Sequence, residues 1–367
     1  MNRCVAVLLS LFALWQRPTA AQPLPPLFPI RIGDLHGLID ARGRVVVPPE
    51  FAEVAQGEPL ILLRKGSRTA YANAGGQMVI EPQETLTRPF ASGLTPAPGR
   101  GDPGRMRWGY AGPDGKLVLP ATWTSAEPFV DGLAVVGQTD AWGVERFGVI
   151  NRKGELVLPT QHEKLLAPAA GLVRAQSKER THRVFDSQGR DLTPPKVDFV
   201  GVPAGGLVRI WSGRKQGYMS LDGTVVVAPQ YDNASDFSEG RARVWVDGKY
   251  GYIDERGQLV VPAQYETAEA FSDGLALVRA GGTAQYIDRD GRVALQPPGD
   301  RGMPFAEGLA AQRRDGRYGY VDKTGRWVIE PQFSAAQPFR NGLAYVVQGR
   351  ASGWIDRAGQ FVWRTER

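Results

Sequence analysis

Two stretches of this sequence, GYIDERGQLVVPAQY at Gly251–Tyr265 and GYVDKTGRWVIEPQF at Gly319–Phe333, follow one template. The template recurs along the chain, and each copy contains a glycine at a turn between two strand-like runs. These turn glycines are Gly43, Gly76, Gly115, Gly154, Gly189, Gly223, Gly257, Gly291, Gly325 and Gly359. The first four intervals between them vary in length, and the last five are identical, as the residue numbers show. Self-similarity at a fixed period indicates a repeat architecture, here with about ten units.

A second signature, Phe-x-x-Gly, lies between the turn glycines and is usually followed by Leu-Ala. Its copies are Phe90–Gly93, Phe129–Gly132, Phe237–Gly240, Phe271–Gly274, Phe305–Gly308 and Phe339–Gly342. A unit of this size cannot bury both of its faces alone and must pack on its neighbours. We therefore expect the phenylalanine to anchor one unit to another. The copies around Gly43, Gly154 and Gly189 lack it, so the first half of the array is less regular.

Each unit is predicted to contain three short strands, such as Gly274–Val278, Tyr250–Asp254 and Leu259–Pro262. Valine, isoleucine and aromatic residues at this density favour strands, and none of the runs has a helical period. The Asp-x-x-Gly between the second and third strands indicates a hairpin in which aspartate caps the turn and glycine takes a positive φ. A single aspartate per loop is too few oxygens for calcium, so capping is the preferred interpretation.

The expected fold class is therefore all-β, with residues 32–367 forming a tandem array of about ten three-stranded β-meander repeats. Such units can stack into an open, twisted solenoid or close into a propeller-like ring. Propeller blades typically have four strands in about 40 to 50 residues. Three strands in a shorter unit, with two longer intervals from Gly76 to Gly154, favour the open solenoid over the closed ring.

The repeat resembles the bacterial WG repeat, which is named for a Trp-Gly before a strand like Tyr-Ile-Asp. Trp108-Gly109-Tyr110 matches this pattern literally, and other units replace the tryptophan, as in Tyr250-Gly251 and Phe147-Gly148. The resemblance covers nearly all of the chain after its N-terminal segment. It implies a repeat protein without a general biochemical activity.

The N-terminal segment is predicted to be a targeting sequence. Residues 1–21 have the features of a signal peptide, with Arg3 before the apolar run Val5–Trp15 and small residues at the expected cleavage site. Residues 22–31 are predicted to be a proline-rich lead-in. The apolar run is too short to span a membrane. These features predict an exported protein, periplasmic or extracellular, with no membrane span.

Catalytic and metal-binding patterns are weak in this sequence. Ser212–Lys215 and Lys323–Gly325 match motifs of penicillin-recognising enzymes, but the repeat places both in hairpin turns, without the helix that the serine needs. The three histidines, His36, His162 and His182, have no metal-ligand spacing. We therefore expect no enzyme activity, no metal and no cofactor. The alternative is a hydrolase or lyase with an unrecognised site in a propeller-like channel.

Basic residues recur in and around the turn between the first and second predicted strands. They are Arg64, Lys65, Arg68, Arg105, Arg107, Lys178, Arg180, Arg214, Lys215, Lys249, Arg313, Arg314 and Arg317. Equivalent turns of a repeat array lie along one edge, so these residues are predicted to form a basic ligand-binding edge. Acidic residues such as Glu239, Asp273 and Glu307 lie instead in the linkers between repeats.

The partner of such an edge is expected to be a protein or an anionic envelope polymer. The formal net charge is +6, which removal of Arg3 and Arg17 with the signal peptide lowers to +4. Export and this modest charge disfavour nucleic acid as a partner. The sequence therefore predicts an exported, non-catalytic binding or scaffold protein.

Overall fold

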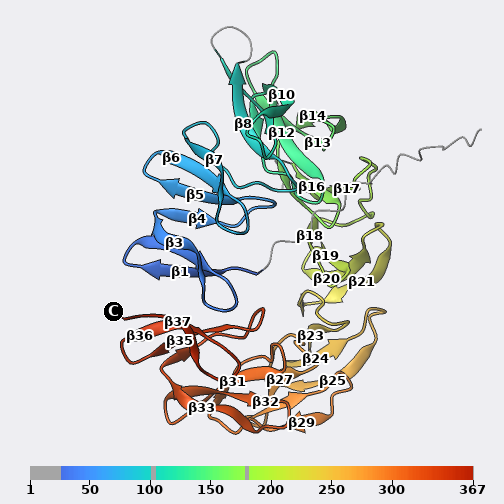
Figure 1. Ribbon diagram of the computed structural model, residues 1–367. Helices are drawn as coiled ribbons and strands as arrows, with labels where there is room; N and C mark the ends of the chain where they lie inside the picture. The colour runs from blue at the N-terminus through green and yellow to red at the C-terminus, as the bar shows by residue number, and fades with distance from the viewer. Residues whose placement is uncertain (1–25, 101–104, 178–181, 367) are drawn as a thin grey trace, which may run out of the picture.

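The computed structural model describes residues 26–100, 105–177 and 182–366, which form 37 strands and no helix. The strands make ten antiparallel sheets in chain order. The sheets follow one another around a ring, and each is one blade of a ten-bladed β-propeller (Figure 1). Blades are numbered here from the N-terminus.

The strands of blades 1 to 5 have the following bounds. Blade 1 contains β1 (Phe28–Ile32), β2 (Leu35–Ile39) and β3 (Val45–Phe51); blade 2 contains β4 (Glu53–Ala55), β5 (Ile61–Lys65), β6 (Arg68–Ala72) and β7 (Met78–Gln83); blade 3 contains β8 (Thr95–Arg100), β9 (Met106–Ala111) and β10 (Leu117–Trp123); blade 4 contains β11 (Ser125–Ala126), β12 (Leu133–Thr139), β13 (Glu145–Asn151) and β14 (Leu156–His162); and blade 5 contains β15 (Leu165–Ala169), β16 (Leu172–Gln176) and β17 (His182–Phe185).

Blades 6 to 10 have four strands each. Blade 6 contains β18 (Phe199–Ala204), β19 (Leu207–Ser212), β20 (Lys215–Ser220) and β21 (Val225–Tyr231); blade 7 contains β22 (Asn233–Ala234), β23 (Ala242–Val246), β24 (Lys249–Ile253) and β25 (Leu259–Tyr265); blade 8 contains β26 (Thr267–Ala268), β27 (Ala276–Ala280), β28 (Thr283–Ile287) and β29 (Val293–Leu295); blade 9 contains β30 (Arg301–Gly302), β31 (Leu309–Arg314), β32 (Arg317–Asp322) and β33 (Trp327–Phe333); and blade 10 contains β34 (Ala335–Ala336), β35 (Ala344–Gln348), β36 (Ala351–Ile355) and β37 (Phe361–Glu366).

The ring is closed by contacts between the first and the last blade, which lie side by side in Figure 1. The indole Nε1 of Trp354 donates a hydrogen bond to the carbonyl oxygen of Pro29 at 2.8 Å. The rings of Phe28 and Trp354 meet with centroids 5.1 Å apart, and Leu343 packs with Ile30 in the same apolar cluster. The expectation of an open solenoid was therefore wrong.

Two features that the sequence pattern hides explain the closed ring. Seven of the ten described sheets have a fourth strand, which in blades 4 and 7 to 10 is very short and comes from the linker. A strand as short as β26 has no alternating pattern by which a sequence could reveal it. The array also begins before the expected boundary at residue 32, because β1 lies within the predicted lead-in. Residues 1–21, predicted to be a signal peptide, lie outside the described residues.

The two longer intervals, from Gly76 to Gly115 and from Gly115 to Gly154, do not disturb the ring. In both, the segment from the turn glycine to the glycine of Phe-x-x-Gly has the same length as in the shorter units. The additional residues fall in the hairpins β8–β9 and β12–β13, which are longer than hairpins such as β23–β24. The segment that joins neighbouring blades therefore keeps its length in these units.

The Asp-x-x-Gly turns are capped as the sequence predicts. In blade 7, Asp254 Oδ1 accepts hydrogen bonds from the backbone NH groups of Arg256 at 3.0 Å and Gln258 at 2.9 Å. The glycine of the WG-like motif has a different role. A Cβ on Gly251 would lie 2.6 Å from the carbonyl oxygen of Val261, because β25 bulges over β24 at this position. Glycine is required there so that the two backbones can approach.

The core between blades is built from one repeated aromatic pair. In blade 7, Tyr252 is buried in β24 and meets Phe271, from the β26–β27 connection of blade 8, with ring centroids 4.8 Å apart. The Tyr252 hydroxyl donates to the carbonyl oxygen of Glu269 at 2.6 Å, which satisfies its only polar group. The equivalent pairs, with centroids 4.7 to 5.1 Å apart, are Tyr71–Phe90, Tyr110–Phe129, Tyr218–Phe237, Tyr286–Phe305 and Tyr320–Phe339.

Candidate functional site: the two faces of the ring

Antiparallel strands place the turns of each blade at two opposite ends, so the ring has two faces. The hairpin face carries the β1–β2, β5–β6, β8–β9, β12–β13, β16–β17, β19–β20, β23–β24, β27–β28, β31–β32 and β35–β36 turns. The opposite face, called here the interlock face, carries the Asp-x-x-Gly and Phe-x-x-Gly turns. All described members of the predicted basic edge lie in or beside the turns of the hairpin face. Lys178 and Arg180 lie outside the described residues.

Most of these basic side chains are paired with acids on the same face. Lys215 Nζ lies 2.7 Å from Asp232 Oδ1, and Lys249 Nζ lies 3.9 Å from Glu266 Oε1. In both cases the acid follows the outer strand of the same blade, which ends at the hairpin face. The other pairs are Arg64–Glu53 at 3.1 Å, Lys65–Glu50 at 3.8 Å, Arg313–Asp300 at 3.0 Å and Arg314–Glu330 at 2.9 Å. The edge is therefore a surface of alternating charge.

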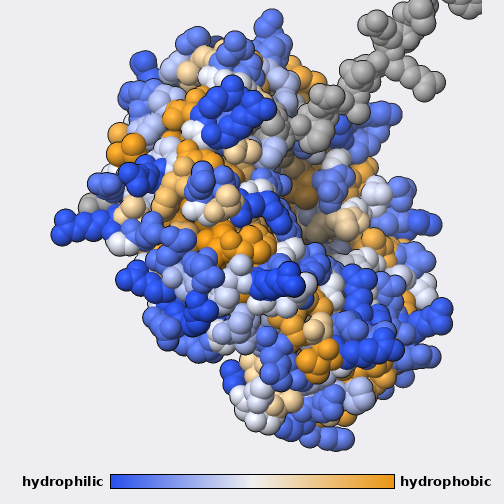
Figure 2. Space-filling view, turned by 60° about the horizontal axis from the view of Figure 1, so that its bottom comes forward, coloured by the Kyte–Doolittle hydropathy of each residue, from blue (hydrophilic) through white to orange (hydrophobic). Residues whose placement is uncertain are grey.

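Five basic residues of the edge have no carboxylate partner among the described residues. Arg68, Arg105, Arg107 and Arg214 form no ion pair there, while Arg317 donates to the carbonyl oxygen of Gln332 at 3.3 Å. Arg105 and Arg107 belong to the long hairpin of blade 3. In Figure 2, hydrophilic residues cover most of the face shown, and hydrophobic residues form separate patches between them.

The long hairpins of blades 3 and 4 add a feature that the basic pattern did not reveal. The side chain of Trp142, at the β12–β13 turn, is 89% exposed, and Met106, at the start of β9, is 68% exposed. The hairpins lie in adjacent blades at the top of Figure 1. The signal in the sequence was the pair of longer intervals between Gly76 and Gly154, which marked insertions at this turn.

The tip that carries Trp142 is a structured turn. Asp140 Oδ1 accepts hydrogen bonds from the backbone NH groups of Trp142 and Val144, both at 2.9 Å. The hydrogen bond from Val144 is the largest cause that lowers the pKa of Asp140, and Arg146 also contributes. The carboxylate thus stays ionised at neutral pH and caps the turn through these two hydrogen bonds. An exposed tryptophan on an ordered turn loses little conformational freedom on binding.

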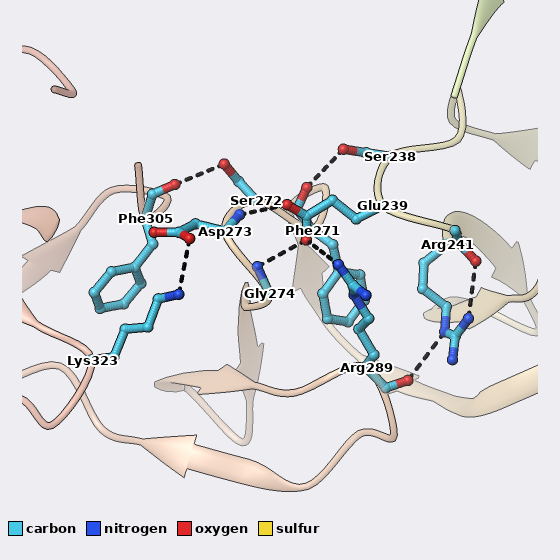
Figure 3. Close-up of polar contacts among 11 residues, drawn as sticks. Ser238, Glu239, Arg241, Phe271, Ser272, Asp273, Gly274, Arg289, Phe305 and Lys323 are labelled. Atoms are coloured by element: carbon cyan, nitrogen blue, oxygen red, sulfur yellow. Dashed lines mark hydrogen bonds and ion pairs between the residues drawn. The ribbon is translucent and has the colours of Figure 1, made fainter. Parts of the chain in front are cut away.

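The interlock face joins neighbouring blades through acidic residues of the Phe-x-x-Gly turns (Figure 3). Glu239 has a left-handed backbone, with φ of 51°, and its carboxylate accepts hydrogen bonds from the NH groups of Asp273 at 2.7 Å and Gly274 at 2.8 Å in the next blade. Arg289, in the Asp-x-x-Gly turn of that blade, completes the contact at 3.0 Å. The carboxylate of one turn therefore holds the backbone of the next.

The same interlock continues along the second half of the ring. Asp273 accepts a hydrogen bond from the NH of Gly308 and pairs with Lys323 at 2.9 Å. Glu307 in turn accepts from the NH groups of Asn341 at 2.5 Å and Gly342 at 2.9 Å. The sequence placed these linker acids away from the basic edge. In the structure they form the hydrogen bonds and ion pairs that join neighbouring blades.

The interlock predicts an acid-sensitive contribution to stability. Burial alone would raise the pKa of Glu239, but hydrogen bonds from Arg289 and from the NH groups of Gly274 and Asp273 lower it below its ordinary value of 4.5. A lowered folded-state pKa stabilises the protein above pH 4.5, and this contribution is lost as the pH falls through the folded-state value. We expect Glu239→Gln to be less stable than wild type in urea unfolding at neutral pH, and the difference to vanish at low pH.

The control for this experiment is Glu81→Gln. Glu81 is exposed and forms no hydrogen bond or ion pair with a described residue. Its substitution should leave the pH dependence of unfolding unchanged. A difference between Glu239→Gln and wild type that persists unchanged at low pH would contradict the role given to the Glu239 charge.

The remaining motifs from the sequence have structural roles or no partners. Burial lowers the pKa of both His162 and His182, whose rings pack on Phe185 and Phe199 with centroids 5.6 and 4.2 Å apart. Lys323, of the Lys-Thr-Gly match, belongs to the interlock. Among the described residues, no three or more His, Cys, Asp or Glu side chains are grouped to hold a metal ion. The same residues include no helix of the length and hydropathy that crossing a bilayer requires.

Comparison with known proteins identifies the repeat in four segments of the chain. The family model described as WG containing repeat matches residues 108–142, 217–250, 250–283 and 318–350. These four segments of the chain are therefore WG repeats. Each matched segment begins in the strand that contains the WG-like glycine or its equivalent (β9, β20, β24 and β32) and runs into the next blade, so the sequence repeat and the blade are offset.

Among solved structures, a eukaryotic initiation factor is similar over 93% of this chain and 96% of its own, at 11% identity and a TM-score of 0.51. This likeness concerns the fold alone. Dihydro-heme d1 dehydrogenase NirN in complex with DHE (13% identity, 97% and 76% coverage, TM-score 0.37) and Kluyveromyces lactis Hsv2p (11%, 64% and 95%, TM-score 0.34) also match. At these TM-scores the likeness supports no conclusion. A search of the curated proteins found no match.

Proposed function

We propose that this WG-repeat propeller is an exported binding scaffold without catalysis of its own, and that it binds a protein partner on the hairpin face. The observation that carries the proposal is the exposed Trp142 on the ordered tip of the blade 4 hairpin. Tryptophan and arginine are enriched among the residues that contribute most to protein–protein binding. Trp142 lies in the blade next to that of Arg105 and Arg107, whose cations have no described carboxylate partner.

The charge pattern favours a protein over an anionic polymer. A polymer needs many unpaired cations that act together, but six of the eleven described basic-edge residues are paired with carboxylates. Ion pairs of this kind reduce the field that a polyanion would experience. A face with both charge signs and exposed apolar side chains such as Trp142 has instead the kinds of group found in protein interfaces, which combine an apolar core with a polar rim.

Absence of catalysis is proposed because the recurring carboxylates of the two turn signatures have structural roles. The aspartates of the Asp-x-x-Gly turns cap their own backbone, as Asp254 does. The acids of the Phe-x-x-Gly turns bind the next blade, as Glu239 does. The acids that recur at these two signatures are therefore assigned to structure and not to general acid–base catalysis.

The test compares capture of cell-envelope proteins by three immobilised forms of the chain. We expect a partner that is retained by wild type to be lost with Trp142→Ser, with an increase in Kd of about 30-fold, or about 2 kcal/mol. The control is Val118→Ser, because Val118 is a 59% exposed apolar side chain on the outer strand β10, away from the hairpin turns. Equal capture by the Trp142→Ser and Val118→Ser variants would refute the proposal, as would retention of anionic polysaccharide alone.

A further inference from the structure

In blades 6 and 7, the second strand of the blade faces the first strand of the next blade. An arginine of the second strand fills the space between these two strands. The Arg209 guanidinium donates to the carbonyl oxygen of Ala234 and lies 4.8 Å from the ring centroid of Trp211. Arg243 donates in the same way to Ala268 and lies 5.1 Å from the ring centroid of Tyr250. Both arginines are the third residue after the glycine of the preceding turn.

The arginine is replaced by Val135 in blade 4, where β12 packs against β15 of blade 5. The aromatic pair is missing at the same boundary, because Val149 stands where other blades have tyrosine and Pro168 where they have the Phe-x-x-Gly phenylalanine. The result is a groove of about 520 Å³ lined by Val135, Phe147, Leu165, Leu166 and Pro168, among others. Smaller side chains at three repeated positions thus leave an apolar groove open.

Blade 8 also has an aliphatic residue at the arginine position beside a groove. Leu277 is the equivalent residue there, and a smaller groove of about 340 Å³ lies beside it, lined also by Met303 and Tyr318. Both grooves adjoin an aliphatic residue at this position. Blades 6 and 7, which keep arginine, hold its guanidinium against the next blade instead.

The groove between blades 4 and 5 has one free charge. Lys164 lies in its wall, is exposed, and forms no ion pair with a described carboxylate. Glu127 also lines the groove, but Arg88 neutralises it at 2.7 Å. The wall is otherwise mainly aliphatic and aromatic. Its charge therefore complements a single anionic group attached to an apolar body.

We infer that this groove binds a small amphiphilic carboxylate, with an aliphatic chain against Val135, Phe147 and Leu165 and its carboxylate near Lys164. The volume lies in the range of small-molecule sites, which are mostly apolar with a few polar groups that orient the ligand. The inference is independent of the protein-binding face proposed above, because it rests on the space between two blades.

Isothermal titration with decanoate tests the inference, with decanol as the uncharged probe. We expect wild type to bind one decanoate and Val135→Arg, which restores the arginine of blades 6 and 7, to weaken binding at least tenfold. The matched control is Leu277→Arg, which fills the smaller groove and should bind decanoate as wild type does. Lys164→Gln should weaken decanoate by up to about fivefold and leave decanol unchanged, since an exposed ion pair contributes little.

The outcomes that overturn the inference are distinct. If wild type gives no heat of binding with decanoate, the inference is refuted. If wild type and Val135→Arg bind decanoate equally, the site lies elsewhere. If only Leu277→Arg loses binding, the site is the groove beside blade 8. An equal effect of Lys164→Gln on decanoate and decanol would show that the anionic group is not recognised.

Discussion

Phe271→Ala is expected to lower the free energy of unfolding by about 3–5 kcal/mol, the range for loss of a buried phenylalanine. Phe271 is 1% exposed and belongs to blade 8, but its ring packs on Tyr252 of blade 7. Its removal therefore leaves a cavity between two blades and not within one. The substitution should also weaken the contact that fixes the Phe-x-x-Gly turn against its neighbour, where the Ser238 hydroxyl donates to the Phe271 carbonyl at 2.7 Å.

Urea unfolding of the Phe271→Ala variant measures this effect, and Phe199→Ala provides the same chemical change at a surface site. Phe199 is 39% exposed, so its substitution should cost much less. The anchor role of Phe271 is refuted if the two variants unfold at the same urea concentration.

The sequence predicted the repeat, the turns and the anchor residue because these depend on local chemistry. Asp254 caps its turn and Phe271 is buried, as their positions in the template indicate. Ring closure could not be predicted in the same way. It depends on the angle between blades summed over ten units, and on short strands such as β26 that have no sequence pattern. Open and closed arrays share almost all local features.

The sequence predicted where the basic residues of the hairpin face lie, but not that most of them are paired with acidic residues. The repeat placed Lys215 and Lys249 at equivalent turns, and the structure keeps both on the hairpin face. Their partners Asp232 and Glu266 come from the segment that follows the outer strand of each blade. Only the blade topology shows that this segment returns to the same face. Trp142 was missed because its significance is its exposure, which no pattern of residue types encodes.

The groove between blades 4 and 5 results from a side chain that the repeat normally has and this copy lacks. The absence of phenylalanine from the copy before Gly189 was visible in the sequence. A missing anchor indicates irregularity, but whether the space collapses or stays open depends on the neighbouring backbone. Here the side chains of β12 and β15 leave a groove although the two strands pack against each other. Degenerate repeats are therefore the places where a regular propeller can acquire a binding site.

Gly43→Ala is expected to open the ring at its seam. Gly43 has a φ of 79°, and a Cβ at this position would lie 2.1 Å from the carbonyl oxygen of Val362 in β37. Left-handed backbone costs a residue with a Cβ roughly 1–2 kcal/mol, and overpacking adds about 1–3 kcal/mol. Because the obstacle is the backbone of blade 10, relief requires that blade 1 move away from it. We expect a total loss of about 2–5 kcal/mol in the free energy of unfolding.

Gly66→Ala separates the two contributions. Gly66 has a φ of 61° and nothing within 4 Å of the added Cβ, so only the backbone term applies. The difference between the two variants in urea unfolding thus measures the seam contact itself. Amide hydrogen exchange should rise in β1 to β3 and in β35 to β37 for Gly43→Ala, and in neither group for Gly66→Ala. The closed seam is disproved if both variants show the same loss of stability and the same exchange, because an open array has no neighbour at Gly43 for the new methyl group to meet.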